Sequence, residues 1–356
     1  MPELEEVFRM ATQRTRPEPG ALERQHARER RRVVRQKTAV YSLVALVTIG
    51  VVIAAIAVPR SPRKPMNRQS GLISAPSAGE HAVIVGLDGS IRQTVTAVPG
   101  GSCCPALSPD GTRIAFVAGV HISVVGIDGT GLRELGPAFA ASSTPSWSPD
   151  GSQIAFVGSR DGGQDDIYVM DADGSNVRRL TNDLADDDWP AWSPDGGTIA
   201  YANSGSRPLD ASGFSPTDEI YTVPATGGRP TRLTDNRVDD TMPSYSPDGS
   251  QIAIHRSGGL WIMNADGSNA REIPLPGGCC TGFTPRWSPD GTKIAFTRCC
   301  ASWRYNGLPV LAVNIVDLND RVLPVPGAEM VTDANVPQWL PSGDELLLYR
   351  VERPRS

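Results

Sequence analysis

Residues 147–156 read WSPDGSQIAF, and this stretch decides the fold because close copies of it recur along most of the chain. Pro149 presets the backbone for the second position of a type I turn, Asp150 can bond to the nearby backbone, and Gly151 can take the left-handed conformation that closes a hairpin. Residues 153–157 are rich in β-branched and aromatic side chains and too few for a helix. The stretch therefore predicts a tight β-turn that leads into a strand.

The turn occurs six times, and successive copies are 40 to 53 residues apart. A second turn sequence follows each of the first five copies, so each unit holds two hairpins, or four antiparallel strands. Four strands in a repeat of this length are typical of a propeller blade. The other copies of the first turn lie at residues 107–111, 192–196, 245–249, 287–291 and, in a worn form, 339–343; the second turns lie at 127–129, 171–174, 225–228, 264–267 and 317–320.

The sixth unit lacks a second hairpin downstream, but an unmatched hairpin sequence lies upstream at residues 81–92. We expect the last blade to be shared, with its inner two strands from residues 337–351 and its outer two from residues 81–97. Hydrogen bonds between the two ends of the domain would then close the ring. The predicted fold class is all-β, a six-bladed propeller of four-stranded antiparallel blades.

The phrases Trp-Ser-Pro-Asp-Gly and Asp-Ala-Asp-Gly-Ser-Asn, the second followed by Arg-Leu-Thr, resemble the WD-repeat-like units of TolB-type six-bladed β-propellers. The resemblance covers residues 81–351. It implies a propeller that binds a partner, with the channel mouth as the place to look. The aspartates of the turns are explained by turn chemistry. A calcium loop is not expected there, because the remaining ligands and the terminal Glu of an EF-hand are absent.

The N-terminal region predicts a membrane anchor. Residues 39–58 are apolar and carry no charge, and 20 residues of helix span the ~30 Å hydrocarbon core. Seven Lys or Arg residues lie in the fifteen positions before the stretch and four in the fifteen after it, which places the N-terminus in the cytoplasm. The alternative is a cleaved signal peptide, because Ala55-Ile56-Ala57 is a small-residue site.

The predicted organisation has four parts. Residues 1–37 form a cytoplasmic basic tail, 38–58 a single transmembrane helix, 59–79 a Pro/Ser-rich flexible linker, and 80–352 the propeller, outside the cell membrane. Residues 1–78 carry a net charge of +8 and the remainder −13. An acidic domain argues against a nucleic-acid partner, because phosphate binding requires positive charge.

The cysteines occur as three neighbouring pairs. The Ser-Pro-Asp-Gly turns should lie on one face of the ring, the turn face, and the connections between blades on the opposite one, the connection face. All three pairs are expected on the connection face, where an extracytoplasmic domain favours disulfides. Connectivity stays open, and a thiolate metal site or redox chemistry is the alternative. The disulfide candidates are Cys103, Cys104, Cys279, Cys280, Cys299 and Cys300.

Carboxylates also gather in the connections predicted on this face. They should edge the mouth of the central channel, either as a solvated acidic rim or as a site for a cation or a basic peptide segment. The predicted ligand contacts are Asp186, Asp187, Asp188, Asp239, Asp240 and Asp333.

Catalytic motifs are missing from the sequence: it has no G-x-S-x-G elbow, no H-E-x-x-H helix and no phosphate-binding Gly loop. We therefore expect a non-catalytic protein without a metal or cofactor, which binds a protein or peptide partner in the cell envelope. Two other functions stay open. The propeller could be an enzyme acting on an extracellular polymer such as polysaccharide, or a sensor that signals to a cytoplasmic partner through residues 4–11.

Overall fold

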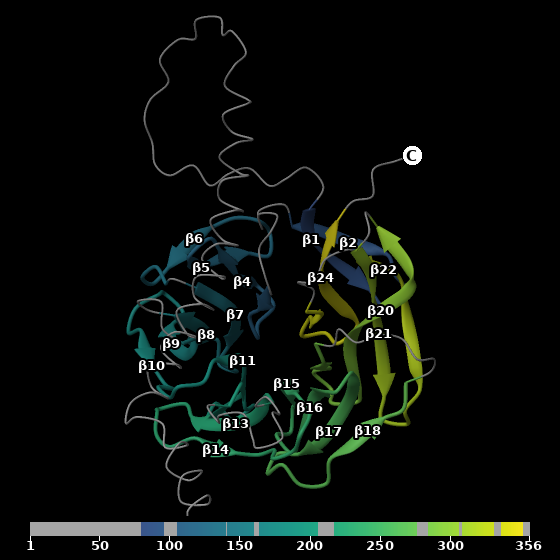
Figure 1. Cartoon of the computed structure of the whole chain (residues 1–356). Coiled ribbons are helices and arrows are strands. Elements are labelled where there is room, and N and C mark those ends of the chain that lie inside the picture. Colours follow the sequence, from purple (N-terminus) through teal and green to yellow (C-terminus); the bar gives the residue numbers. More distant parts are fainter. Residues whose placement is uncertain are drawn as a thin grey trace, which may run out of the picture. The chain divides into compact units, whose positions relative to one another are not determined.

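The computed structural model describes residues 80–95, 105–139, 141–159, 164–205, 217–275, 284–305, 308–330 and 336–351. All of them belong to one compact unit, Ile73–Ser356. Their strands form six four-stranded antiparallel sheets, which follow one another around a central axis (Figure 1). The predicted all-β, six-bladed propeller is confirmed. The predicted transmembrane helix at residues 38–58 lies outside the described residues.

Blades 1 to 5 each use four consecutive strands, with the first strand innermost. Blade 1 holds β3 (Ala106–Leu107), β4 (Arg113–Ala118), β5 (His121–Gly126) and β6 (Arg133–Leu135); blade 2 holds β7 (Ala141–Trp147), β8 (Gln153–Ser159), β9 (Asp166–Asp171) and β10 (Arg178–Arg179). Blade 3 holds β11 (Asp187–Trp192), β12 (Thr198–Asn203), β13 (Glu219–Pro224) and β14 (Thr231–Arg232); blade 4 holds β15 (Asp240–Tyr245), β16 (Gln251–Arg256), β17 (Gly259–Asn264) and β18 (Arg271–Ile273). Blade 5 holds β19 (Arg286–Trp287), β20 (Lys293–Tyr305), β21 (Leu308–Asp317) and β22 (Val322–Met330).

Blade 6 is built from both ends of the domain, as predicted. It combines β23 (Gln338–Trp339) and β24 (Glu345–Val351) with β1 (Glu80–Gly86) and β2 (Ile91–Val95), in the order β2-β1-β24-β23. Strands β1 and β24 pair antiparallel without a register shift, from Glu80 opposite Val351 to Gly86 opposite Glu345. Ile84 and Leu347, at the centre of this pairing, are buried in the core shared with blade 1. Backbone hydrogen bonds therefore close the ring.

The Ser-Pro-Asp-Gly turns have the geometry expected from their sequence. In blade 2, Ser148 Oγ donates to Asp150 Oδ1 over 2.6 Å, and the backbone N of Ser152 donates to the same oxygen over 3.0 Å. Ser148 Oγ in turn accepts from the backbone N of Gln153, and Gly151 has a φ of 69°. These bonds lower the pKa of Asp150 to about 2, and the bond from Ser148 has the largest effect. The hydrogen bonds of the turn occupy the Asp150 carboxylate, in keeping with its structural role.

The Ile-Ala-Phe runs hold neighbouring blades together. In β8, Ile154 and Phe156 pack against blade 1, whereas Ala155 and Val157 pack against blade 3. Successive side chains of a strand point to opposite faces, so one strand contributes to both cores. All four of these side chains are at most 2% exposed.

Indole groups add a second link between blades. The Nε1 atoms of three tryptophans donate to a first-strand carbonyl of the preceding blade: Trp147 to Ala106, Trp192 to Ser146 and Trp339 to Arg286, over 2.9 to 3.1 Å. Trp287 differs, because its buried Nε1 has no hydrogen-bond partner among the described residues. The tryptophan of the WSPDG phrase thus fixes adjacent blades through a directional bond.

Candidate functional site

Five of the six predicted acidic contacts are described; they lie where blades 2, 3 and 4 meet, and the structure separates them by burial. Asp186 and Asp239 are exposed. Each accepts a hydrogen bond from a backbone N of the preceding blade, Asp165 N to Asp186 Oδ1 over 3.1 Å and Asp218 N to Asp239 Oδ1 over 3.2 Å. These two bonds leave most of both carboxylates in solvent.

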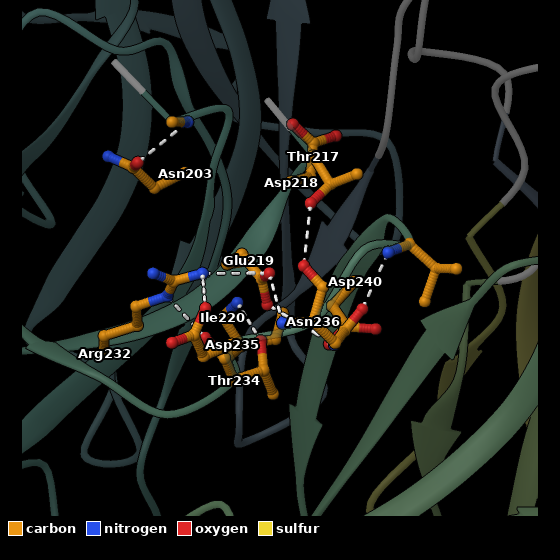
Figure 2. Close-up of polar contacts among 12 residues, drawn as sticks. Asn203, Thr217, Asp218, Glu219, Ile220, Arg232, Thr234, Asp235, Asn236 and Asp240 are labelled. Atoms are coloured by element: carbon orange, nitrogen blue, oxygen red, sulfur yellow. Dashed lines mark hydrogen bonds and ion pairs between the residues drawn. The ribbon is translucent and has the colours of Figure 1, made fainter. Parts of the chain in front are cut away.

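Asp240 occupies a charge-balanced cluster and is 0% exposed. Arg256 donates to both of its oxygens, Nε to Oδ1 over 2.6 Å and Nη2 to Oδ2 over 2.7 Å. Asn236 Nδ2 adds a third bond and also joins Asp240 to Glu219, which pairs with Arg232 Nη2 over 3.0 Å (Figure 2). The prediction of Asp240 as a ligand contact is corrected, because the carboxylate is buried and its oxygens are bonded within the chain.

Asp187 holds the equivalent position one blade earlier. It lies opposite Asn203 at the start of the β11 and β12 pair, as Asp240 lies opposite Arg256 in β15 and β16. Asn203 Nδ2 donates to Asp187 Oδ1 over 2.7 Å, but Oδ2 has no hydrogen-bond partner among the described residues. Within the described ranges, no guanidinium pairs with Asp187 as that of Arg256 pairs with Asp240.

The pKa of Asp187 is raised to about 7, chiefly by burial; the charges of Asp183 and Asp166 act in the same direction, and hydrogen bonds with Thr181 and Asn203 oppose them. The hydroxyl of Tyr201 also lacks a partner in the described part, and burial with nearby Asp187 raises its pKa. Asp187 is 0% exposed, so the prediction that it contacts a ligand at the surface is corrected as well.

Asp188 lies next to the central channel. Thr144 Oγ1 and the backbone N of Trp189 donate to its Oδ1 over 3.1 and 2.7 Å. Thr144 and Trp189 both line the channel cavity. The pKa of Asp188 is raised to about 6, chiefly by burial, and the charges of Asp165 and Asp218 contribute to this rise. The acidic side chains of blades 2 to 4 thus lie close together on this side of the channel mouth.

Three first strands bend at the same point beside this mouth. Register shifts interrupt the pairing of β7, β11 and β15, and each shift contains a non-glycine residue with positive φ that precedes a proline. A non-glycine residue in this conformation is uncommon and often marks a functional site. The three residues are Thr144 (φ 45°), Trp189 (φ 59°) and Met242 (φ 57°). The sequence signal, a bulky residue before the proline of each first strand, was not used in predicting the site.

The channel itself is a cavity to which all six blades contribute. Its waist, of about 200 Å³, is lined by the residue that follows the first-strand proline in each blade. The hollow next to it, of about 400 Å³, is lined by the prolines and aromatic side chains of the Ser-Pro-Asp-Gly turns and so faces the turn face. The six waist residues are Ala106, Ser146, Ala191, Ser244, Arg286 and Gln338.

Known proteins share this architecture. Residues 74–209 match the family described as the TolB beta propeller domain. A solved structure from Agrobacterium tumefaciens, assigned to TolB, is 22% identical and aligns with a TM-score of 0.63 over 78% of this chain and 100% of its own. TolB from Acinetobacter baumannii is also 22% identical, with a TM-score of 0.53 over 70% of this chain and 64% of its own. The domain therefore has the six-bladed β-propeller fold of the TolB structures, and its residues 74–209 resemble the TolB beta propeller domain.

An enzyme also shares the fold of this propeller. An oligogalacturonate lyase from Vibrio parahaemolyticus is 15% identical and aligns with a TM-score of 0.50, over 78% of this chain and 79% of its own. At this identity the likeness concerns the fold alone. Within the described ranges, no group of three His, Cys, Asp or Glu side chains is placed to hold a metal ion.

Five of the predicted site and disulfide residues fall outside the described residues: Asp333, Cys103, Cys104, Cys279 and Cys280. The backbone of Cys299 and Cys300 is described and lies inside β20, opposite Leu311 and Val310, rather than after the strand as predicted. The strand extends because β20 and β21 continue to pair up to Tyr305 and Leu308.

The membrane search covers the described part only. No helix in that part is long and apolar enough to cross a membrane.

Proposed function

We propose that this chain is a non-catalytic, membrane-anchored TolB-type propeller that binds a basic, extended segment of an envelope protein at the connection-face mouth of its channel. The observation that carries the proposal is the coincidence of three aligned, left-handed bulges with an acidic mouth. Asp186 and Asp239 supply exposed carboxylates, and Asp188 lies beside the bulges at Thr144 and Trp189.

The strain supports a binding role. A residue held in a left-handed conformation costs about 1 to 3 kcal/mol, and such residues cluster at ligand-binding sites. Three of them in adjacent blades define the edge of one opening, and the proline after each removes a backbone donor. The edge therefore presents carbonyl and carboxylate oxygens, which suit the N–H groups of Lys and Arg side chains.

The proposal includes an anchor at residues 38–58, with the propeller outside the membrane. The apolar length and the basic flank before it support this placement. Protease treatment of intact spheroplasts tests it: degradation of residues 80–351 is expected while an epitope on residues 1–37 stays protected. Protection of the propeller would contradict the placement.

The binding site is tested by removing three charges. The variant Asp186→Asn, Asp188→Asn, Asp239→Asn should lose most crosslinking to its envelope partner in whole cells. The control Glu134→Gln, Glu272→Gln, Asp344→Asn also removes three exposed acids, but from the outer strands β6 and β18 and from a turn, and should crosslink normally. Equal loss in both variants would mean that net charge, and not the mouth, governs capture.

A further inference from the structure

The waist of the channel carries one cation in a ring of small side chains. Ala106, Ser146, Ala191 and Ser244 leave room across the channel from Arg286, and Gln338 lies next to it in the ring order. Arg286 lines the waist, the hollow on the turn face and the narrow space toward the connection face. It is the one charged residue among the described residues that line these spaces.

The charge of Arg286 is not balanced within the described part of the chain. One bond is formed, from Nη1 to the carbonyl of Pro285 over 2.9 Å, and no ion pair is made. A guanidinium has five N–H donors in a planar fork, and the bond to Pro285 uses only one of those of Arg286. Burial lowers the pKa of Arg286 to about 10, which leaves the group protonated at neutral pH.

Two other partly buried arginines, Arg256 and Arg232, each have a carboxylate partner. Arg256 is bonded to both oxygens of Asp240, and Arg232 is bonded to Glu219. A partly desolvated charge without a counterion is unfavourable. A ligand that supplies an anion would therefore gain a charge-assisted pair in surroundings of low polarity.

The residues that line the hollow on the turn face indicate what the rest of the ligand is like. The hollow above the waist is lined by an aromatic residue from each of blades 2 to 6, Leu107 from blade 1, and six prolines. Flat apolar walls favour a flat or apolar body. A single guanidinium matches one carboxylate in charge and in bidentate geometry, whereas a phosphate dianion would keep one negative charge unbalanced. The aromatic residues are Trp147, Trp192, Tyr245, Trp287 and Trp339.

We infer that Arg286 is an anion-binding residue: it takes the carboxylate of a ligand whose apolar body fills the hollow on the turn face. The carboxylate belongs either to a small organic acid or to the end of a peptide chain. The hollow that holds the apolar body lies on the turn-face side of Arg286, away from the acidic mouth, and the inference does not depend on the function proposed for that mouth.

The test uses the full chain in uncharged detergent, with benzoate as probe and benzamide as its neutral isostere. Calorimetric titration should detect benzoate and not benzamide. Arg286→Gln should weaken benzoate binding at least tenfold, and Arg286→Lys should weaken it less, because Lys keeps the charge but loses the planar fork. Arg271→Gln is the matched control, since Arg271 is an exposed arginine of β18 paired with Asp320. Normal binding by Arg286→Gln, or equal binding of the two probes, would overturn the inference.

A second measurement needs no variant. Benzoate should raise the melting temperature of the wild-type chain above the values in chloride and benzamide at equal ionic strength, and an equal shift in all three would also overturn the inference. The source of the carboxylate is then resolved with acetyl-Ala-Trp. If acetyl-Ala-Trp with a free carboxylate binds tighter than benzoate, and its amidated form does not bind, the ligand is a peptide end. If benzoate binds tighter than acetyl-Ala-Trp, the ligand is a small organic acid.

Discussion

The replacement Asp187→Asn should stabilise the propeller at alkaline pH. Asp187 is 0% exposed, and its Oδ2 has no hydrogen-bond partner among the described residues. An amide of the same shape removes the charge while its oxygen can still accept from Asn203. The substitution thus relieves a buried carboxylate without opening a cavity.

The magnitude follows from the pKa of Asp187, which burial raises from 3.8 to about 7. At 1.36 kcal/mol per pKa unit this corresponds to about 4 kcal/mol. Because the folded pKa lies above the unfolded one, the folded state holds the proton more tightly. Stability from protonated Asp187 is therefore complete below pH 3.8 and is lost as the pH rises through about 7. The variant should gain little at pH 4 and about 4 kcal/mol at pH 8.

Urea unfolding of both proteins at pH 4, 6 and 8 measures this difference. The matched control is Asp240→Asn, at the equivalent position of the next blade, where Arg256 balances the carboxylate. Loss of that pair should destabilise the propeller by about 3 kcal/mol or more at pH 8. The reasoning is refuted if the effect of Asp187→Asn does not change with pH, or if both variants are destabilised alike.

Three further predictions concern the ring and are each measured by urea unfolding. Gly267→Ala should cost about 3 kcal/mol, because its Cβ would overlap the Leu233 carbonyl, whereas Gly227→Ala, with open space around it and a φ of 90°, should cost about 1 kcal/mol; equal losses would count against the steric argument. Trp339→Phe should be about 1 kcal/mol more destabilising than Trp287→Phe, because only the first indole donates a hydrogen bond and both are 8% exposed. Ile84→Asp should unfold the domain by placing a charge in the closing sheet, whereas Ile91→Asp, 48% exposed in β2, should change stability by less than about 0.5 kcal/mol; a folded Ile84→Asp would argue against closure through β1 and β24.

The fold could be predicted because its information is local and repeated. Each WSPDG phrase combines a turn with the strand that follows, and the unmatched hairpin at residues 81–92 indicated the shared blade. The site was harder to predict, because burial depends on partners that are distant in the sequence. Asp187 and Asp240 occur in similar acidic runs beside exposed Asp186 and Asp239, and the opposing residue, Asn203 or Arg256, was not visible from the run itself.

The channel residue was missed for a related reason. Arg286 precedes Trp287 in an ordinary copy of the repeat, and its importance appears only when the six copies are aligned around the ring. At that position four other blades carry Ala or Ser. A comparison of repeats position by position would have shown an arginine in a ring of small residues, although not the lack of a counterion.

Site-specific photo-crosslinking in the native cell tests the central claim most directly. A photoreactive residue at position 239, on the connection face, should form an adduct with one envelope protein. The same residue at position 266, in an exposed turn on the opposite face, should form none. An adduct from position 266 and none from position 239 would contradict binding at the connection-face mouth.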